Sequence, residues 1–444
     1  MVDTPTPQPS SGIFRTLARE EQGQYSIDGV DPVYLAEPKD NDEIEEVLSH
    51  AKNLSSSVIP RGNGTKLGIG SKPKTLGIVL VTKNLDKLIE HQHENLTFTA
   101  EAGMTLSEAQ EILSSKAQFI PLDPHHSSKA TLGGIAATNS AGPMMMRYGT
   151  SRDLIIEMKA VTASGNSIRS GAKVVKNVAG YDLKKLFIGS FGTLGVISEL
   201  TFRTYPLPES EVTLLAQFES PKDAFAASRA VRDTGPSVTS IELLDDGAFG
   251  LITDSYAPTK TTSWTLAIRI DGYASVIEKW SSRISEVCSK NGSRHTDELK
   301  GAESKRLWNS INEIEGVPLL DRSVHLNISV PQSTTLQIID KLSGFRSRRD
   351  IDLAVGALPS LGSIHAFFLA KGHSGIDFGN IVEALRLSAL ELNGNLTVYS
   401  APPEIKETLD VWGPTLPEIR LMKAIKENFD PDGIMTPGRF VGGL

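Results

Sequence analysis

Apolar residues recur at helical spacing in several parts of the chain, a pattern typical of amphipathic helices with one buried face. The stretches 40–53 and 105–116 show it most clearly, and Glu108 can complete a capping box with Thr105. We therefore predict a helix in each stretch. In the first, the apolar face is formed by Ile44, Val47, Leu48 and Ala51.

Alternation of apolar and polar residues predicts strands between these helices. A strand over 155–162, a turn over 163–166 and a partner strand over 167–169 together predict a hairpin. Further strands are predicted at 57–60, 96–102 and 196–204. Because Pro206 and Pro208 stop the last of these strands, we expect a domain boundary near residue 209.

From 209 to 410 predicted helices alternate with predicted strands, which suits a second α+β domain. Its helices are expected at 221–232 and 274–289, and its strands at 264–270, 325–330 and 363–370. A last helix is predicted between 417 and 428 and stops at the Asp-Pro-Asp-Gly sequence 430–433.

Composition narrows the class of protein. Forty-five Lys and Arg against fifty-three Asp and Glu give a net charge of −8, which provides no general attraction for nucleic acid or an anionic membrane. The only cysteine, Cys288, excludes an internal disulfide, a cysteine-based zinc site and a cysteine-ligated iron–sulfur cluster, and fits a reducing cytoplasm. No apolar run approaches the roughly 20 residues that span a bilayer. We expect a cytoplasmic protein, at most peripheral to a membrane.

A glycine-rich loop follows the predicted strand 57–60. In the segment from Arg61 to Lys66, small residues let a phosphate approach the backbone, where successive amide N–H groups form an anion-binding nest. A plain strand-to-loop turn is the equally ordinary alternative for such a loop. The chain contains neither the GxxxxGK[ST] phosphate loop nor the GxGxxG dinucleotide fingerprint, so a Rossmann-type fold is not supported.

A second glycine-rich block extends from Gly133 to Gly195, with ten glycines in sixty-three residues. Close approach of backbone to a ligand would explain this density. The segment from Arg147 to Lys185 contains eight basic residues and three acidic ones. This local excess of positive charge favours binding of a diphosphate, or simply forms a solvated basic surface.

Three motifs occur in the order that is typical of one superfamily. They are the PxxGxGT-like sequence 60–65, an Asp-Pro pair at 123–124 followed by Thr-Leu-Gly-Gly at 131–134, and the GxxGTLGxI sequence 189–197. In these motifs the chain resembles the FAD-binding oxidoreductases of the vanillyl-alcohol oxidase (PCMH) type. The segments 176–183 and 437–440 resemble, within that superfamily, the FAD-binding E subunits of bacterial glycolate oxidases. The resemblance is good over residues 58–208 and over the last thirty residues. From 209 to 410 the chain matches the family only in length and in general sequence character.

The resemblance implies an α+β fold, in which a PCMH-type FAD-binding domain of two α+β subdomains at 25–208 is followed by a ferredoxin-like α+β cap or substrate domain at 209–412. The segment 1–24 is expected to be disordered or extended, and 413–444 to return to the FAD domain. By the family's motifs, 61–65 wrap the FAD diphosphate, and Tyr181 and Asp182 either touch the flavin or only help to join the halves of that domain. The residues implied to bind FAD are Arg61, Gly62, Asn63, Gly64, Thr65, Asp123, Thr131, Gly133, Gly134, Gly192 and Ile197.

Departures from the family pattern matter as well. The first loop ends in Thr65-Lys66 without the histidine that attaches flavin covalently in some members, and Cys288 is expected on a surface helix, so we predict noncovalent FAD. The GDGNxH and EHG motifs of metal-dependent 2-hydroxy-acid oxidisers are absent, and no metal site is expected. His325 and His365, on predicted strands, are candidate catalytic residues or satisfied core histidines. His125 and His126 lie beside the second loop and can also simply cap a turn.

Three functions follow from the resemblance. The first is the FAD-binding subunit of a glycolate oxidase-like complex that oxidises a 2-hydroxy acid, with a second flavoprotein and an iron–sulfur subunit as partners. The second is a self-sufficient dehydrogenase for D-lactate or another 2-hydroxy acid. The third is a scaffold subunit without catalysis. In each enzymatic case the flavin carries the redox chemistry, and the protein supplies orientation and electrostatics.

Overall fold

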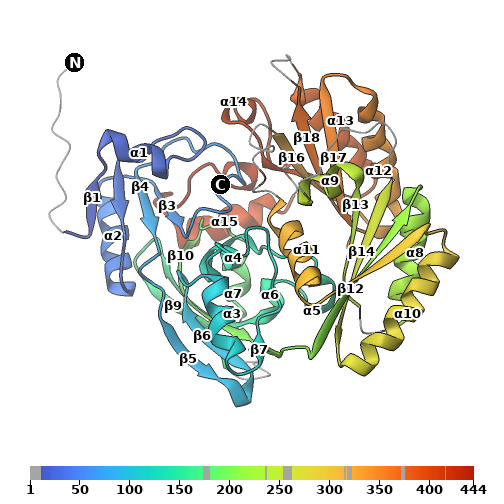
Figure 1. Cartoon of the computed structure of the whole chain (residues 1–444). Coiled ribbons are helices and arrows are strands. Elements are labelled where there is room, and N and C mark those ends of the chain that lie inside the picture. The colour runs from blue at the N-terminus through green and yellow to red at the C-terminus, as the bar shows by residue number, and fades with distance from the viewer. Residues whose placement is uncertain are drawn as a thin grey trace.

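Figure 1 shows the computed structural model of the chain, which describes residues 12–173, 181–235, 238–253, 263–314, 317, 323–371, 376–415 and 417–444. Three main sheets organise it, two in the N-terminal half and one in the C-terminal half. Among the described residues, no helix is both long and apolar enough to cross a membrane.

The first sheet has four strands in the order β1-β2-β4-β3, with β4 parallel to both of its neighbours and β1 antiparallel. Helix α2 packs against this sheet. It begins after Asp40, whose carboxylate accepts a hydrogen bond from the Glu43 N–H, and the predicted apolar face of α2 is buried. The elements are β1 (Phe14–Thr16), α1 (Arg19–Tyr25), β2 (Tyr34–Ala36), α2 (Asn41–Asn53), β3 (Val58–Arg61) and β4 (Ile78–Val81).

The N-terminal segment differs from the expectation of a disordered or extended stretch. Residues 1–11 lie outside the described part, but from residue 12 the chain is folded into β1 and α1. The reason is burial: Phe14 is 4% exposed and contacts the Tyr34 ring edge-on at 5.4 Å between centroids, and Leu17 is 3% exposed.

The second sheet is antiparallel with the order β5-β6-β10-β8-β9, and β8 and β9 form the predicted hairpin. Apolar residues of the sheet and of α3 and α4 form one buried cluster. Thr105 caps α3 in the predicted capping box with Glu108. The elements are β5 (Leu88–Gln92), β6 (Thr97–Glu101), α3 (Leu106–Ser114), α4 (Leu132–Thr138), α5 (Met145–Tyr148), α6 (Ser151–Leu154), β8 (Ile155–Thr162), β9 (Ser167–Gly171), α7 (Lys184–Phe187) and β10 (Gly195–Arg203), with β7 (Gln118–Phe119) and β11 (Tyr205–Pro206) forming a separate pair.

The third sheet is wholly antiparallel, with the strand order β15-β12-β14-β13-β17-β18-β16-β19. Helices α8, α10, α12 and α13 bury one face, and α9 and α11 cover part of the other (Figure 1). The strands are β12 (Ser210–Phe218), β13 (Val238–Asp245), β14 (Trp264–Gly272), β15 (His295–Lys300), β16 (Ser323–Ser329), β17 (Ile351–Leu358), β18 (Ser363–Ala370) and β19 (Asn395–Ser400). The helices are α8 (Pro221–Arg232), α9 (Asp246–Ile252), α10 (Ala274–Lys290), α11 (Ala302–Asn312), α12 (Thr335–Ser343) and α13 (Phe378–Glu391).

Cys288 lies on α10, an amphipathic helix with one exposed side, in agreement with the predicted surface helix. It lies on the inner face of α10 and is fully buried, because its helix turns that side to the sheet. Burial raises the pKa of its thiol to about 12, so the thiol is neutral and unreactive.

The C-terminal segment lies against the first sheet. After α14 (Pro403–Lys406) and α15 (Ile419–Phe429), Met435 forms a parallel bridge with Val58 of β3. Lys406, whose side chain is 1% exposed, forms an ion pair with Asp28 at 2.9 Å and donates to the Gly68 and Gly70 carbonyls. The segment thus joins the two halves of the molecule, while the domain limits 25–208, 209–412 and 413–444 stay predictions.

Candidate active site

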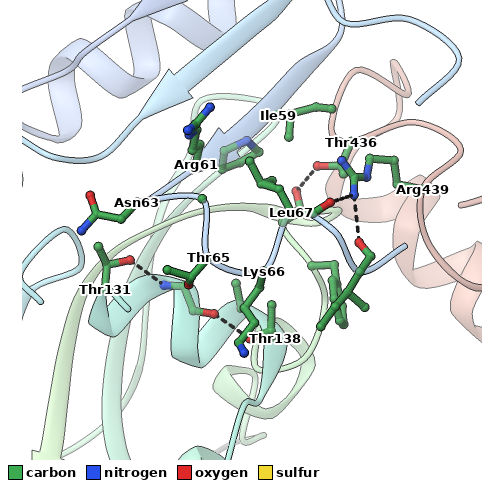
Figure 2. Close-up of a pocket in the computed structure, with 18 residues that line it drawn as sticks. Ile59, Arg61, Asn63, Thr65, Lys66, Leu67, Thr131, Thr138, Thr436 and Arg439 are labelled. Carbon is green, nitrogen blue, oxygen red and sulfur yellow. Dashed lines mark hydrogen bonds between the residues drawn. The ribbon is translucent and has the colours of Figure 1, made fainter. Parts of the chain in front are cut away.

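The glycine loop after β3 forms one wall of a pocket (Figure 2). Helix α4 forms another wall, and the C-terminal segment closes it through Thr436 and Arg439. The structure therefore brings together three parts of the chain that are far apart in sequence. The predicted residues that line the pocket are Arg61, Gly62, Asn63, Gly64, Thr65, Thr131, Gly134 and Gly192.

Side chains at the loop's start hold it in place. The Arg61 guanidinium donates to the Gln24 carbonyl at 3.0 Å and lies over the Tyr25 ring, and its burial lowers its pKa. The Asn63 amide donates to the Lys129 carbonyl at 2.8 Å. Gly64 has φ +77°, a conformation that side chains other than glycine rarely adopt. These contacts fix the shape of the loop, and its backbone faces the pocket.

Glycines at the contact between loop and helix allow a close approach. A Cβ at Gly62 would lie 2.1 Å from the Thr131 hydroxyl oxygen. That hydroxyl caps α4 by accepting from the Gly134 N–H at 3.2 Å. The glycine at 62 is therefore required by its contact with Thr131, which the sequence motif did not reveal.

A second pocket adjoins the first, and Arg61, Gly62, Gly134 and Gly192 line both. It is lined in addition by Gly133 and Ile197, so ten of the eleven predicted cofactor residues surround this pair of pockets.

Asp123 is the exception and lines neither pocket. It is 6% exposed, and its carboxylate accepts from the Met144 N–H at 3.1 Å, so it holds the neighbouring loop in place. The family resemblance implied that it contacts the cofactor, since its Asp-Pro pair belongs to the second motif. Desolvation by burial raises the pKa of Asp123 to about 7.

Tyr181 and Asp182 also lie away from both pockets. Tyr181 is 94% exposed, and Asp182 pairs with Lys184. The preceding residues 174–180, which carry most of the KNVAGYDL motif, lie outside the described residues.

Arg439 was not among the predicted site residues, although its Pro-Gly-Arg-Phe motif was noted. It is 4% exposed and donates through Nη2 to the carbonyls of Leu67 (2.6 Å) and Ile69 (2.8 Å) (Figure 2). Within the described part of the chain its Nη1 has no hydrogen-bond partner. A buried, unpaired donor beside a pocket is costly unless a ligand accepts from it.

Charge and shape together suit a diphosphate-bearing cofactor. Arg61, Lys66 and Arg439 line the first pocket, and none of the described residues lining it is acidic. The residues present therefore fit an anionic group held by loop N–H groups and three cations.

We expect Arg439→Met to weaken cofactor binding about tenfold to a hundredfold, because one charge-assisted hydrogen bond contributes about 1.5–3 kcal/mol. Equilibrium dialysis of the flavin against the purified variant measures this. The control is Arg283→Met, on α10, whose guanidinium lies over the Trp280 ring. Equal flavin affinity of the Arg439 variant and the wild type would contradict the assignment.

The two candidate histidines lie in contact with each other. His325 Nε2 and His365 Nδ1 are 2.9 Å apart, and the Asn327 amide lies 3.3 Å from His365 Nε2. His125, from the other half of the molecule, lies against His365 with ring centroids 5.2 Å apart. Alternation along β16 and β18 had left open whether these side chains face the core. The pairing of the strands, which the pattern does not specify, brings them together.

A third cavity connects this histidine cluster (His125, His325 and His365) with the cofactor pocket. His125 and His365 line it, and it shares Lys66, Ile69, Thr138 and Phe191 with the first pocket. None of its described lining residues is acidic. Among the described residues, no group of three or more His, Cys, Asp or Glu side chains could hold a metal ion.

Two family models match the chain in its two halves. The model described as "FAD binding domain" matches residues 32–171, and that described as "FAD linked oxidases, C-terminal domain" matches 207–316 and 412–440. Together they cover more than half of the chain, including the loop that follows β3 and the segment that carries Arg439.

Two relatives match over most of their own length, and a third matches over less than half of it. Glycolate oxidase subunit GlcD of Bacillus subtilis is 29% identical, over 92% of this chain and 88% of the relative. The mitochondrial D-lactate dehydrogenase [cytochrome] of Arabidopsis thaliana is 28% identical, over 92% and 73%. D-2-hydroxyglutarate dehydrogenase of Xanthomonas citri pv. viticola is 35% identical over 45% of this chain and 43% of the relative.

Solved structures share the fold. 4-Ethylphenol oxidase from Gulosibacter chungangensis superposes with a TM-score of 0.73 at 14% identity, covering 96% of this chain and 94% of that one. An alkyldihydroxyacetonephosphate synthase gives 0.69 at 18% identity, covering 92% and 76%. The α+β PCMH-type fold expected from the sequence is confirmed. With the pockets, the family matches and the fold in agreement, the chain belongs to the FAD-linked oxidases and is an FAD-dependent oxidoreductase.

Proposed function

We propose that the protein oxidises a small 2-hydroxy acid, glycolate being the simplest, with FAD bound noncovalently in the two adjoining pockets. The observation that carries the proposal is the cavity that joins the first pocket to the histidine cluster. The names of the relatives support the substrate class, since they are a glycolate oxidase subunit, D-lactate dehydrogenases and a D-2-hydroxyglutarate dehydrogenase.

The residues of the pockets would hold the cofactor as the family motifs imply. Loop residues 61–65 would surround its diphosphate, with Arg61 and Arg439 supplying positive charge. Thr131, Gly133 and Gly134 would lie along the adenosine and diphosphate, and Gly192 and Ile197 near the rest of the cofactor. Asp123 would not contact the cofactor. It would hold in place the loop that contains Met144, by accepting from the Met144 N–H.

The cavity has the chemistry of a site for a hydroxy acid. Lys66 places positive charge at its wall and no described acidic residue opposes it, which favours the substrate carboxylate. His365 would accept the proton of the substrate hydroxyl, and His325 and Asn327 position its ring. FAD, when bound, accepts the two electrons that leave with the substrate's C–H hydrogen.

We expect His365→Gln to slow flavin reduction by substrate at least about a hundredfold while FAD content stays normal, since a general base contributes about 10²–10⁴. Anaerobic stopped-flow absorbance with glycolate, D-lactate and D-2-hydroxyglutarate measures the rate. The matched control is His295→Gln, a largely exposed histidine on edge strand β15. A His365 variant reduced as fast as the control would remove this residue from the chemistry.

The same experiment on the wild type tests the proposed function. Rapid bleaching by one of these acids supports it and shows that the chain acts alone. Bleaching only after a second flavoprotein and an iron–sulfur subunit are added supports the subunit of a complex, and contact with a membrane would then come through those partners. A chain that retains no FAD when purified would favour the scaffold.

A further inference from the structure

A small cavity lies beside the histidine cluster and shares no lining residue with the first pocket. It has a volume of about 30 Å³, enough for one or two water molecules. His125 and His365 line both this cavity and the one that we assign to the substrate. Glu242 of β13 also lines it.

The register of three neighbouring strands explains why the cavity exists. Gly356 of β17 is paired with Leu244 of β13 on one side and directly with His365 of β18 on the other. A Cβ at Gly356 would lie 3.3 Å from Glu242 Oε1. The missing side chain at Gly356 therefore leaves the gap between the Glu242 carboxyl and the His365 ring.

Glu242 has an acidic neighbour from the other half of the molecule. Asp123 interacts with it electrostatically, and both are buried, at 6% exposure each. Burial raises the pKa of Glu242 well above its usual value, and Asp123 raises it further. The pKa of Asp123 is lowered by three neighbours, which are Arg269, the Asn312 side chain and the Met144 N–H. The pKa of Asp123 is nevertheless about 7, so its carboxyl can exchange a proton near neutral pH, while the raised pKa of Glu242 favours the protonated form of that carboxyl.

We propose that Glu242 and Asp123 form a proton-accepting pair near the histidine cluster, reached from His365 through the cavity beside Gly356. The inference rests on the proposed oxidation of a 2-hydroxy acid. Glu242 does not touch the substrate and acts through His365.

Oxidation of the substrate releases one hydrogen with two electrons and one proton. The substrate C–H bond breaks and its hydrogen leaves with two electrons to FAD, while the O–H bond breaks and its proton binds an imidazole nitrogen of His365. A C=O bond forms in the product. The imidazolium then releases a proton through cavity water to a carboxylate oxygen of the pair, which returns His365 to its neutral form.

Two substitutions test the path. Glu242→Gln removes the titratable carboxyl that lines the cavity and links it to Asp123, and Gly356→Ala fills the gap, with its Cβ in contact with Glu242 at 3.3 Å and Leu244 at 3.4 Å. We expect each to slow steady-state turnover with a dye acceptor about tenfold near neutral pH, because His365 must lose its proton before the next substrate reacts. The loss should fade at alkaline pH, where solvent takes the proton from His365, and flavin content should not change. Gly344→Ala, whose added Cβ meets nothing within 4 Å, is the control.

A second measurement needs no substrate. Because the pKa of Asp123 is raised on folding, its contribution to stability is complete below about pH 4 and is lost as the pH rises to about 7. The free energy of unfolding, measured in urea, should fall across this pH range. Asp123→Asn should reduce that fall, and Glu242→Gln should change it as well.

The outcomes separate the two proposals. An unchanged pH profile of steady-state turnover in both Glu242→Gln and Gly356→Ala overturns the proton path but leaves the proposed function intact. An unfolding profile that is the same in wild type and Asp123→Asn overturns the proton-holding pair whatever the substrate. If no 2-hydroxy acid reduces the wild type with its partners present, the proposed function fails and the path fails with it.

Discussion

Gly134→Val is expected to give a folded protein that loses its FAD during purification. Gly134 lies on α4 where it lines both cofactor pockets, and a Cβ there would meet only the Thr131 hydroxyl, at 3.0 Å. The two methyl groups of valine would therefore extend into space that the cofactor needs. Crowding of this kind costs about 1–3 kcal/mol, which corresponds to flavin binding about tenfold to a hundredfold weaker.

The ratio of flavin to protein after gel filtration measures this effect, and circular dichroism shows whether the fold is kept. Gly64→Val should also lose FAD, but for another reason. The φ of +77° at Gly64 disfavours a side chain, and an added Cβ would lie 3.0 Å from the Arg61 guanidinium. Gly344→Val, in the other half of the molecule, is the control. Full flavin content in both folded variants would mean that FAD does not bind here.

Asp430→Ala is expected to lower the free energy of unfolding by about 3–5 kcal/mol, the cost of leaving a buried charge without its partner. The Asp430 side chain is fully buried and pairs with Lys426, whose ammonium also donates to the carbonyls of Thr193 (2.8 Å) and Met435 (2.7 Å). Burial lowers the pKa of Lys426, and Asp430 opposes that shift. The carboxylate also accepts from the Ile434 N–H at 3.0 Å and the Met435 N–H at 2.8 Å.

Urea unfolding of wild type and variant measures the difference. Two residues further on, Asp432 pairs with Lys52 at 2.9 Å where both side chains are substantially exposed, so Asp432→Ala is a matched control with an expected cost of at most about 1 kcal/mol. Equal stability of the two variants would show that the buried pair does not anchor the C-terminal segment.

Local structure was predictable where one physical signal dominated. Helix α8 runs from Pro221 to Arg232 as predicted, because Pro221 suits its first turn and Ser220 caps it. Strand β18 also has the predicted limits, 363–370, since alternation sets which side chains share a face. The motifs led to the loop that lines the first pocket, because glycine is needed wherever backbone must pass close to another group.

Long-range contacts were not predictable in the same way. Alternation does not determine which strands are neighbours, so the meeting of His125 with His325 and His365 required the strand order of the third sheet. Arg439 was missed because one arginine in a short motif has no periodicity. Asp123 lies outside both pockets, because the order of the motifs along the chain does not decide which way a buried carboxylate points.

The links from Lys406 and Arg439 to the loop at 67–70 have a consequence for biosynthesis. They join residues 338 and 372 positions apart, measured from Lys406 to Gly68 and from Arg439 to Leu67. The ribosome makes the loop long before it makes these partners, since synthesis and folding proceed from the N-terminus. The loop at 67–70 therefore reaches its final contacts only after nearly the whole chain has been made. A chain cut short before Arg439 would lack both of that arginine's contacts with the loop.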